Sequence, residues 1–494
     1  MRSSYRGSSD HLFRWISLTL LSLAIIVTMI SLVMYSRQRA FYPAGLTIGD
    51  VPVEGLNAEE TRQRLLQTFS MPVIVELNDS IIRIEPALVG FNLNTEALIA
   101  EADRYRLGTS FWSGFWNFLW NINPNKADVP LIYTIDEQNL INYIETEIKT
   151  RYDQPASPAE PVPGQTNFSP GNPGKELNSQ LAAEAIAAAF VEPVDRTVRL
   201  ITQAVQPGRP QFTNLAIMIQ QIIDLTPFDG TVGVFLQDLR TGEQLQVGYD
   251  LNQNILVDPD IAFTASSTIK IPILVSVYNH LGPELNENTR DLVLEMITKS
   301  ENPASDALME LVGGPLVVSE DMIALGLENT FIAGYFYDGA PLLRQYSTPS
   351  NNRSDITTNP DLYNQTTPSD SGQLLADIYL CANQGGGGLV ATFPTKFNQT
   401  VCTEMLDVLK KDRIGVLLEA GLPEGTPIAH KHGWISGVSG VIQNISDVGI
   451  IFTTNGDYVL SIYTYHPVQT VWDSVSIMIS DISAVVYNYF TLPQ

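Results

Sequence analysis

A serine and a lysine three residues apart, Ser267 and Lys270, stand at the start of a long apolar run. On a helix, positions i and i+3 lie on one face, so the Ser267 hydroxyl and the Lys270 amine are expected to point the same way. A serine hydroxyl becomes an effective nucleophile when a nearby base takes its proton. A lysine can be that base if burial or a neighbouring positive charge lowers its pKa. The pair therefore predicts nucleophilic catalysis, although this spacing alone has low specificity.

Two later segments add further polar side chains, a hydroxyl and an amide in one and an amine in the other. Ser300 and Asn302 lie in one short segment, and Lys431 lies in another that enters a strand-like stretch. Each residue also has a purely structural interpretation. Ser267 could be a helix N-cap, Ser300 and Asn302 could cap a loop, and Lys431 could be a surface lysine. The functional interpretation gains weight because all three segments occur in one order.

That order resembles the penicillin-recognising serine enzymes, above all class A β-lactamases, which carry Ser-x-x-Lys, then Ser-Asp-Asn, then Lys-Thr/Ser-Gly. The resemblance covers residues 213–494 and implies an acyl-enzyme mechanism on a β-lactam or a peptidoglycan-peptide amide. It also implies roles for individual residues: Ser267 as the acylated nucleophile, Lys270 as its proton partner, Ser300 as a proton relay to the leaving nitrogen, Asn302 and Lys431 as contacts for the substrate amide and carboxylate, His432 and Gly433 as neighbouring substrate-binding residues, and the N–H groups of Ser267 and Trp434 as the oxyanion hole.

Three positions depart from that pattern. Glu301 replaces the usual aspartate, and His432 replaces the usual hydroxyl residue. The β-lactamases also place a glutamate before the segment that matches 366–368 here, where it activates the deacylating water. No glutamate occurs between Phe331 and Pro368, and the shorter acids there are Asp338, Asp355 and Asp361. The resemblance therefore predicts an enzyme that acylates better than it turns over.

The segment 213–494 is predicted to be an α+β domain. Strands are expected at 230–239 and 244–249, with another hairpin at 449–452 and 458–463. A mostly helical stretch should follow Ser267 to about Leu380, and a last helix should cover 471–489. Strands at both ends with helices between them indicate an antiparallel sheet with a helical lobe inserted in it.

The N-terminal end of the chain is predicted to cross a membrane once. Residues 1–14 form a short tail that carries three arginines, and 15–35 is a run without charge that is long enough to span a bilayer. A cleaved signal peptide is the competing interpretation, but no small-x-small cleavage site follows. We expect an uncleaved signal anchor in the cell membrane, with residues beyond it outside the cytoplasm.

Residues 41–206 are predicted to form a smaller α+β module. Its segments 49–56 and 86–91 resemble a module assigned to peptidoglycan binding in bacterial wall proteins, so contact with the cell wall is implied. The Pro- and Gly-rich segment 153–175 is expected to be a linker or exposed loop, and 207–210 a hinge to the last domain.

The segment Phe111–Trp120 is dense in aromatic residues. Three interpretations stay open. The aromatic rings could pack internally, form a belt at the membrane surface, or stack on sugars.

Two classes of ligand are not expected. The formal net charge of −25 argues against nucleic acid, since the phosphate backbone would be repelled. His430 and His432 flank Lys431 as a pair that could bind a metal, but no third ligand is evident, so neither a metal nor another cofactor is predicted.

The two cysteines, Cys381 and Cys402, leave a single disulfide and two buried thiols equally open. Two alternative functions also remain: a non-catalytic wall-binding protein with the same fold, and a D-alanyl peptidase, which needs no loop glutamate.

Overall fold

The structure is a computed structural model that describes residues 9–492 except 124, 254 and 437–439. The chain divides into two compact units. The first comprises Met1–Pro155 and Pro173–Val205, and the second comprises Ala156–Asn172 and Gln206–Gln494. Each unit has a hydrophobic core of its own.

The first unit begins with the long helix α1 (Ser9–Gln38). Within the described residues, its segment Leu12–Gln38 is the one helix long and apolar enough to cross a membrane, with a mean hydropathy of 2.5 and none of it buried. The predicted span 15–35 lies inside this helix.

The rest of the first unit is a mixture of short strands and helices around one core. The helix α2 (Ala58–Phe69) follows Asn57, and a capping box between Asn57 and Glu60 holds its first turn. Its strands form the small sheets β2-β1-β6, β11-β3-β4, β10-β12 and β5-β7. The strand bounds are β1 Leu46–Ile48, β2 Val51–Pro52, β3 Val73–Leu77, β4 Ser80–Ile84, β5 Asn92–Leu93, β6 Ala127–Val129, β7 Tyr133–Thr134, β10 Gly174–Glu176, β11 Thr197–Leu200 and β12 Gln203–Val205. The further helices are α3 Thr95–Leu107, α4 Phe111–Leu119, α5 Glu137–Tyr143, α6 Thr150–Tyr152 and α7 Ser179–Phe190.

The segment predicted as a linker or exposed loop, 153–175, is mostly exposed but contains short strands. Residues 156–172, which fall inside the predicted 41–206 module, belong to the second unit and carry the short hairpin β8 (Glu160–Pro161) and β9 (Phe168–Ser169). The ring of Phe168 packs against Tyr489, and the Asn488 amide donates a hydrogen bond to the Thr166 carbonyl at 2.8 Å. Composition alone suggested a loop, but these long-range contacts fix the segment on the unit that it joins.

The second unit is built on a six-stranded sheet in the order β15-β14-β13-β21-β20-β19, in which every neighbouring pair is antiparallel. Its strands are β13 Thr231–Asp238, β14 Gln244–Asp250, β15 Ile255–Val257, β19 Ile428–Ser436, β20 Ile442–Ile451 and β21 Tyr458–Tyr465. These bounds enclose or closely match the predicted hairpins.

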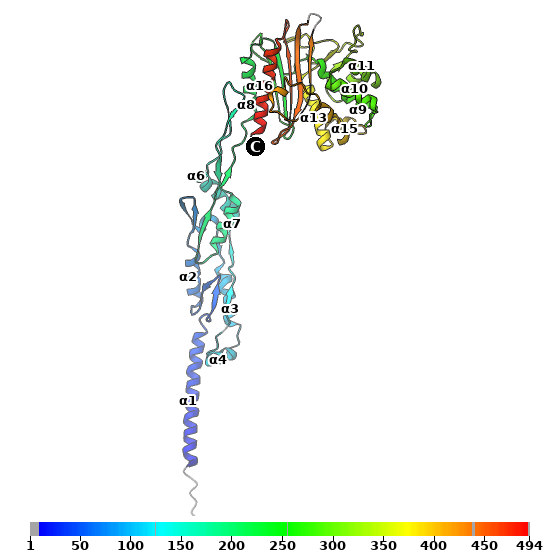
Figure 1. The fold of residues 1–494 in the computed structure, drawn as a ribbon. Coiled ribbons are helices and arrows are strands. Elements are labelled where there is room, and N and C mark those ends of the chain that lie inside the picture. The colour runs from blue at the N-terminus through cyan, green and yellow to red at the C-terminus, as the bar shows by residue number, and fades with distance from the viewer. Residues whose placement is uncertain (1–8, 124, 254, 437–439, 493–494) are drawn as a thin grey trace, which may run out of the picture. The chain divides into compact units, whose positions relative to one another are not determined.

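Alternate side chains of the central strands face two different cores. On β21, Leu460 and Ile462 pack with α8 (Phe212–Leu225) and α16 (Trp472–Thr491), whereas Val459 and Tyr463 pack with the helical lobe. Successive side chains of a strand point to opposite faces of the sheet, so a continuous apolar run supplies residues to both cores. Figure 1 shows α8 and α16 on one side of the sheet and α9, α10, α11, α13 and α15 on the other.

The lobe is less helical than predicted. Its helices are α9 Lys270–Leu281, α10 Glu287–Thr298, α11 Asn302–Val312, α12 Pro315–Ala324, α13 Pro368–Gln384, α14 Gly387–Thr392 and α15 Gln399–Leu409. Residues 333–363, however, form a long loop between β17 (Phe331–Ile332) and β18 (Asn364–Thr366). Side-chain hydrogen bonds stabilise this loop, including Tyr363 Oη to the Ala340 carbonyl at 2.9 Å. The segment is rich in Pro, Gly and Asn, which oppose helix formation.

The cysteine question is resolved in favour of a disulfide. Cys381 on α13 and Cys402 on α15 are bonded to each other, and both are fully buried. The bond joins two helices of the lobe.

Candidate active site

Ser267 lies in a short 3₁₀ turn, Ser266–Ile269, between β16 (Phe263–Thr264) and α9. The prediction placed it at the start of an α-helix, but α9 begins only at Lys270. In a 3₁₀ turn, side chains at i and i+3 are eclipsed, which brings the pair closer still. The Lys270 amine lies 2.9 Å from Ser267 Oγ.

Side-chain hydrogen bonds of Thr268 hold this turn in place. The Thr268 hydroxyl donates to the Ala265 carbonyl at 2.6 Å and contacts the buried Tyr463 hydroxyl at 2.7 Å. From Tyr463 the chain of hydroxyls continues through Ser371 to Thr366. The backbone of the turn is therefore tied to both α13 and the sheet.

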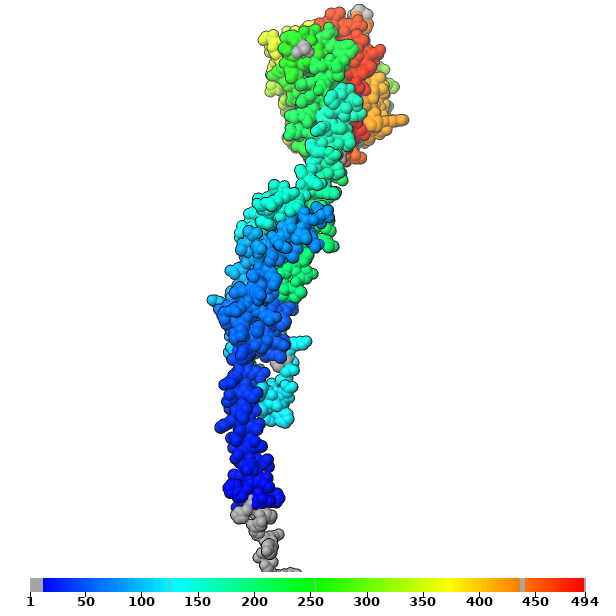
Figure 2. Space-filling model, turned by 90° about the vertical axis from the view of Figure 1, so that its left-hand side faces the viewer, coloured from blue at the N-terminus to red at the C-terminus, as the bar shows by residue number. Residues whose placement is uncertain are grey.

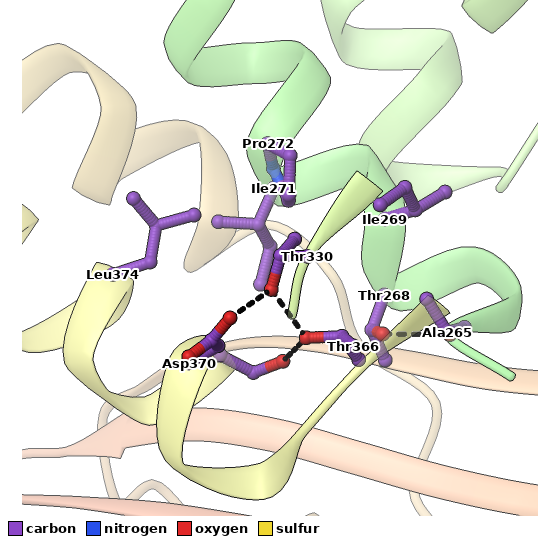
Figure 3. A pocket seen from close by; sticks show the side chains of 10 residues that line it. Ala265, Thr268, Ile269, Ile271, Pro272, Thr330, Thr366, Asp370 and Leu374 are labelled. Atoms are coloured by element: carbon purple, nitrogen blue, oxygen red, sulfur yellow. Dashed lines mark hydrogen bonds between the residues drawn. The ribbon is translucent and has the colours of Figure 1, made fainter. Parts of the chain in front are cut away.

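Figure 3 shows the far end of this hydroxyl chain around a small cavity of about 10 Å³. Thr330 lies 2.9 Å from Thr366 and donates to the Asp370 carboxylate at 2.9 Å. Burial raises the pKa of Asp370 to about 6, against the hydrogen bonds from Thr330 and the Asn329 backbone that favour its charged form. This cluster anchors the turn that carries Ser267.

The Lys270 side chain is completely buried and surrounded by oxygen atoms. Its amine lies 2.8 Å from the Ser300 carbonyl, 3.2 Å from Ser300 Oγ and 3.0 Å from Asn302 Oδ1. The structure thus brings Ser267, Lys270, Ser300 and Asn302 together around one nitrogen atom. Among the described residues, none of these hydrogen-bond partners is a carboxylate.

Burial and the positive charge of Lys431 lower the pKa of Lys270 to about 7, and the negative charges of Glu301, Asp306 and Asp412 oppose this shift only in part. A substantial fraction of the amine is therefore neutral at neutral pH. A neutral amine has a lone pair that can accept the Ser267 proton.

Two serines in the site have left-handed backbones. Ser266 has φ 54° and Ser300 has φ 58°. Such conformations typically cost about 1–3 kcal/mol each and persist where surrounding contacts impose them. At Ser300, this conformation lies between the end of α10 and the start of α11 and lets both its carbonyl and its hydroxyl face Lys270.

Lys431 lies on β19 with its ammonium completely buried. It donates to Asp412 Oδ2 at 3.3 Å, and the His432 ring bonds the same oxygen through Nδ1 at 2.9 Å. Burial lowers the pKa of Lys431, but the Asp412 carboxylate opposes that shift. The predicted role of Lys431 toward a substrate carboxylate stays a prediction.

Asp412 is the charged residue that the sequence analysis missed. Its carboxyl is fully buried, and although burial acts to raise its pKa, the hydrogen bond from His432 and the charges of Lys431 and His430 lower the pKa below its usual value. Asp412 is one of 53 acidic residues and lies just after α15, where no local pattern marks it.

His430 and His432 each bond a different carboxylate. His430 Nδ1 lies 3.0 Å from Asp447 Oδ1, and the His432 ring stacks on Trp434 with centroids 4.8 Å apart. Within the described part of the chain, no group of three or more His, Cys, Asp or Glu side chains could hold a metal ion.

The strand β19 forms an edge of the sheet, so alternate backbone groups point away from β20. At Gly433 the strand passes so close to the Ser267 turn that a Cβ atom would lie 2.9 Å from Ser267 N and 3.1 Å from Ser266 Cβ. Only a glycine fits this approach without displacing one segment. The predicted oxyanion donors, the N–H groups of Ser267 and Trp434, therefore belong to adjacent segments.

The long loop 333–363 brings an aromatic ring to Lys270. The Lys270 amine lies 5.2 Å from the centre of the Phe336 ring. The three acids considered as substitutes for the missing glutamate do not contact Lys270 in the described part of the chain. Asp355 pairs with Arg353, the Asp361 carboxylate accepts from the Tyr363 N–H, and Asp338 is exposed.

Comparisons with known proteins agree with a β-lactamase-like serine hydrolase domain. Residues 279–490 match the model of the β-lactamase enzyme family. This range includes Ser300, Asn302 and the 431–434 segment and begins after Lys270. No curated protein matches the chain.

Solved structures similar to this chain include the structure of PBP-A, with 24% identity and a TM-score of 0.41, covering 57% of this chain and 98% of that one. An ancestral class A β-lactamase (GNCA) shows 18% identity over 55% of this chain and 98% of its own, with a TM-score of 0.41. A β-lactamase from Chitinophaga pinensis shows 16% identity over 56% of this chain and 98% of its own, also with a TM-score of 0.41.

Proposed function

We propose that this protein is a membrane-anchored, extracytoplasmic serine hydrolase that forms an acyl-enzyme on β-lactam or peptidoglycan-peptide amides and deacylates slowly. The observation that carries the proposal is the Lys270 amine, buried, with a pKa lowered to about 7 and 2.9 Å from Ser267 Oγ. Lys270 takes the Ser267 proton as the oxygen attacks the carbonyl carbon of the amide. The C–N bond then breaks as the Ser300 hydroxyl passes a proton to the leaving nitrogen and receives in its place the proton held by Lys270, whose amine lies 3.2 Å from Ser300 Oγ.

The oxyanion of the tetrahedral intermediate needs donors that are already in place. The N–H groups of Ser267 and Trp434 would supply them, and each such donor is typically worth about 3–4 kcal/mol in the transition state. Asn302 and the 431–434 segment would hold the substrate.

Slow deacylation is supported by what surrounds Lys270. From the loop 333–363, the Phe336 ring lies 5.2 Å from the Lys270 amine, and a phenyl ring cannot take a proton. An acyl-enzyme without a positioned base keeps its ester until water attacks unassisted.

The location is supported by two features. The exposed apolar helix α1 is long enough to cross a membrane, and the Cys381–Cys402 disulfide fits an oxidising compartment outside the cytoplasm. Contact of the first unit with peptidoglycan stays a prediction from the sequence resemblance.

Intact-mass spectrometry of the purified chain with benzylpenicillin tests the proposal over time. We expect one adduct on the wild-type protein, none on Ser267→Ala, and persistence of the adduct after free penicillin is removed. Absence of any adduct would contradict the enzymatic proposal, and binding to wall sacculi by both proteins would then favour a non-catalytic module. Nitrocefin turnover faster than about 10 per second, a typical enzyme rate, would contradict slow deacylation.

The lack of a glutamate between Phe331 and Pro368 also favours a second candidate, a D-alanyl peptidase, which needs no loop glutamate. Such an enzyme transfers the acyl group of a stem peptide and releases D-alanine. Measuring D-alanine released from a stem-peptide mimic, with Ser267→Ala as the control, separates the peptidase from a β-lactamase.

A further inference from the structure

The helix α4 carries aromatic rings on two opposite faces. Phe111, Phe115 and Phe118 follow one face at helical spacing, and Trp112, Trp116 and the C-cap residue Trp120 follow the other. The segment 107–125 contains no charged residue. A helix that is apolar on both faces is stable in water only if each face has a partner.

The phenylalanine face has its partner within the first unit. The Tyr35 ring, near the C-terminal end of α1, contacts Phe111, Phe115 and Phe118 with centroids 5.3, 5.7 and 5.6 Å apart. Gly114 permits the approach, since a Cβ there would lie 2.0 Å from the Tyr35 hydroxyl oxygen. These contacts attach α4 to the last turns of α1.

The tryptophan face is open. Trp112, Trp116 and Trp120 are 70%, 60% and 64% exposed. In Figure 2 the α4 segment, in cyan, stands as a separate projection beside the C-terminal part of α1. Three exposed tryptophans on one short helix form an apolar patch that a water-soluble surface rarely leaves uncovered.

The position of α4 along α1 indicates what covers the tryptophan face. Tyr35 lies near the end of the apolar segment, just before Arg37 and Arg39. The Arg39 guanidinium lies 5.4 Å from the centre of the Phe111 ring. If α1 crosses a bilayer, this arginine lies at the height of the lipid phosphates and α4 lies beside it. Tryptophan is enriched at this depth because its ring is apolar and its N–H can bond to headgroups.

We propose that α4 lies in the headgroup region of the bilayer that α1 crosses, with its tryptophan face toward the lipid and its phenylalanine face against Tyr35. The helix thereby makes a second membrane contact beside the anchor. The proposal rests on α1 spanning the membrane and is independent of the chemistry at Ser267.

Tryptophan fluorescence of the full chain in vesicles of phosphatidylcholine and phosphatidylglycerol tests this contact. Some vesicles carry bromine on acyl carbons near the headgroups, which quenches tryptophans that touch them. The base protein carries Trp15→Phe, because Trp15 belongs to α1. A second protein carries Trp112→Phe, Trp116→Phe and Trp120→Phe in addition. Trp434 and Trp472 are present in both proteins, so the difference between their emissions reports the α4 tryptophans alone. The phenylalanines keep the face apolar, and circular dichroism checks the fold.

We expect bromine to cause a clear loss of the α4 emission, because tryptophans of an interfacial aromatic belt lie at the depth of the headgroups. Quenching of Trp15, measured as wild type minus Trp15→Phe, shows separately that α1 is inserted. Quenching of Trp15 without quenching of the α4 emission would overturn the proposal and leave the anchor intact. No quenching of either would overturn both. An α4 emission that ignores bromine but shifts with soluble peptidoglycan glycans would also overturn it and assign the face to sugar.

Discussion

Two fully buried lysines lie in the second unit, and their surroundings differ in one respect. Lys270, at the start of α9, is bonded to hydroxyl, carbonyl and amide oxygens. Lys431, on β19, is bonded to the Asp412 carboxylate. Burial lowers the pKa of both amines. A bonded carboxylate opposes the shift at Lys431, whereas among the described residues the carboxylates that oppose it at Lys270 act without a hydrogen bond to the amine.

This difference distinguishes two roles of a buried lysine, that of a base and that of a positive charge. A buried lysine among neutral oxygens gives up its proton near neutral pH and can serve as a base. A carboxylate beside a buried lysine favours the charged form of its amine, and here the positive charge of Lys431 further lowers the pKa of Lys270. Changing either lysine or its partner should therefore have distinct effects.

The largest effect is expected at the base itself. Lys270→Met should lower the rate of acylation by penicillin by about 10²–10⁴-fold, the usual contribution of a general base. Lys299→Met is the matched control, because that lysine is 62% exposed and pairs with Glu295. Acylation is followed with a fluorescent penicillin under single-turnover conditions. A Lys270→Met rate close to that of Lys299→Met would show that another group takes the proton.

The next effect should follow loss of the counterion. Asp412→Asn leaves Lys431 buried without its carboxylate, and breaking a buried pair typically costs about 3–5 kcal/mol of unfolding free energy. Urea unfolding at neutral pH measures this loss, with the surface variant Asp407→Asn as control; Asp407 is 60% exposed. Asp412 has a lowered pKa in the folded protein, so its contribution is present above the ordinary aspartate pKa of 3.8 and is lost as pH falls through the lower folded value. The difference in unfolding free energy between wild type and Asp412→Asn should become smaller under those acidic conditions. An unchanged difference would contradict the role of the Asp412 carboxylate as the counterion of Lys431.

A smaller effect should appear in the pH profile of acylation. For the wild type, the rate should rise with pH through about 7 as Lys270 loses its proton. Lys431→Met removes the positive charge that helps to lower this pKa, so its profile should move to higher pH. Lys431→Arg keeps the charge and should keep the wild-type midpoint. Identical midpoints in all three proteins would mean that Lys431 does not act on Lys270 through its charge.

The smallest effect is expected beside Lys431. His432→Thr restores the hydroxyl typical of class A β-lactamases, which can donate to a substrate carboxylate. One added hydrogen bond is worth about 0.5–1.5 kcal/mol, so acylation should speed up by about tenfold or less. A β-lactam ester without the free carboxylate is the control and should show no gain. An equal gain on both substrates would show that the smaller side chain simply opens the cleft.

Sequence reasoning reached much of the site because several of its features are local. The pairing of Ser267 with Lys270 follows from their spacing, and the strands at 231–238 and 458–465 follow from apolar residues bounded by turns. The exact form of the Ser267 turn was missed, since a 3₁₀ turn and the first turn of an α-helix have the same residue pattern. The helix α8 was also missed, because its apolar run carries no N-terminal capping signal.

Other features depend on residues that are far apart along the chain. Asp412 meets Lys431 and His432 only because α15 ends against β19, Cys381 meets Cys402 only because α13 packs on α15, and residues 156–172 contact α16. Local spacing and hydrophobic period predicted the pairing of Ser267 with Lys270, the antiparallel hairpins and the apolar N-terminal helix, since backbone geometry repeats over a few residues. Only the tertiary structure decided which acid lies beside which lysine, and so what surrounds each amine, because burial and charge at a site come from segments that the sequence keeps apart.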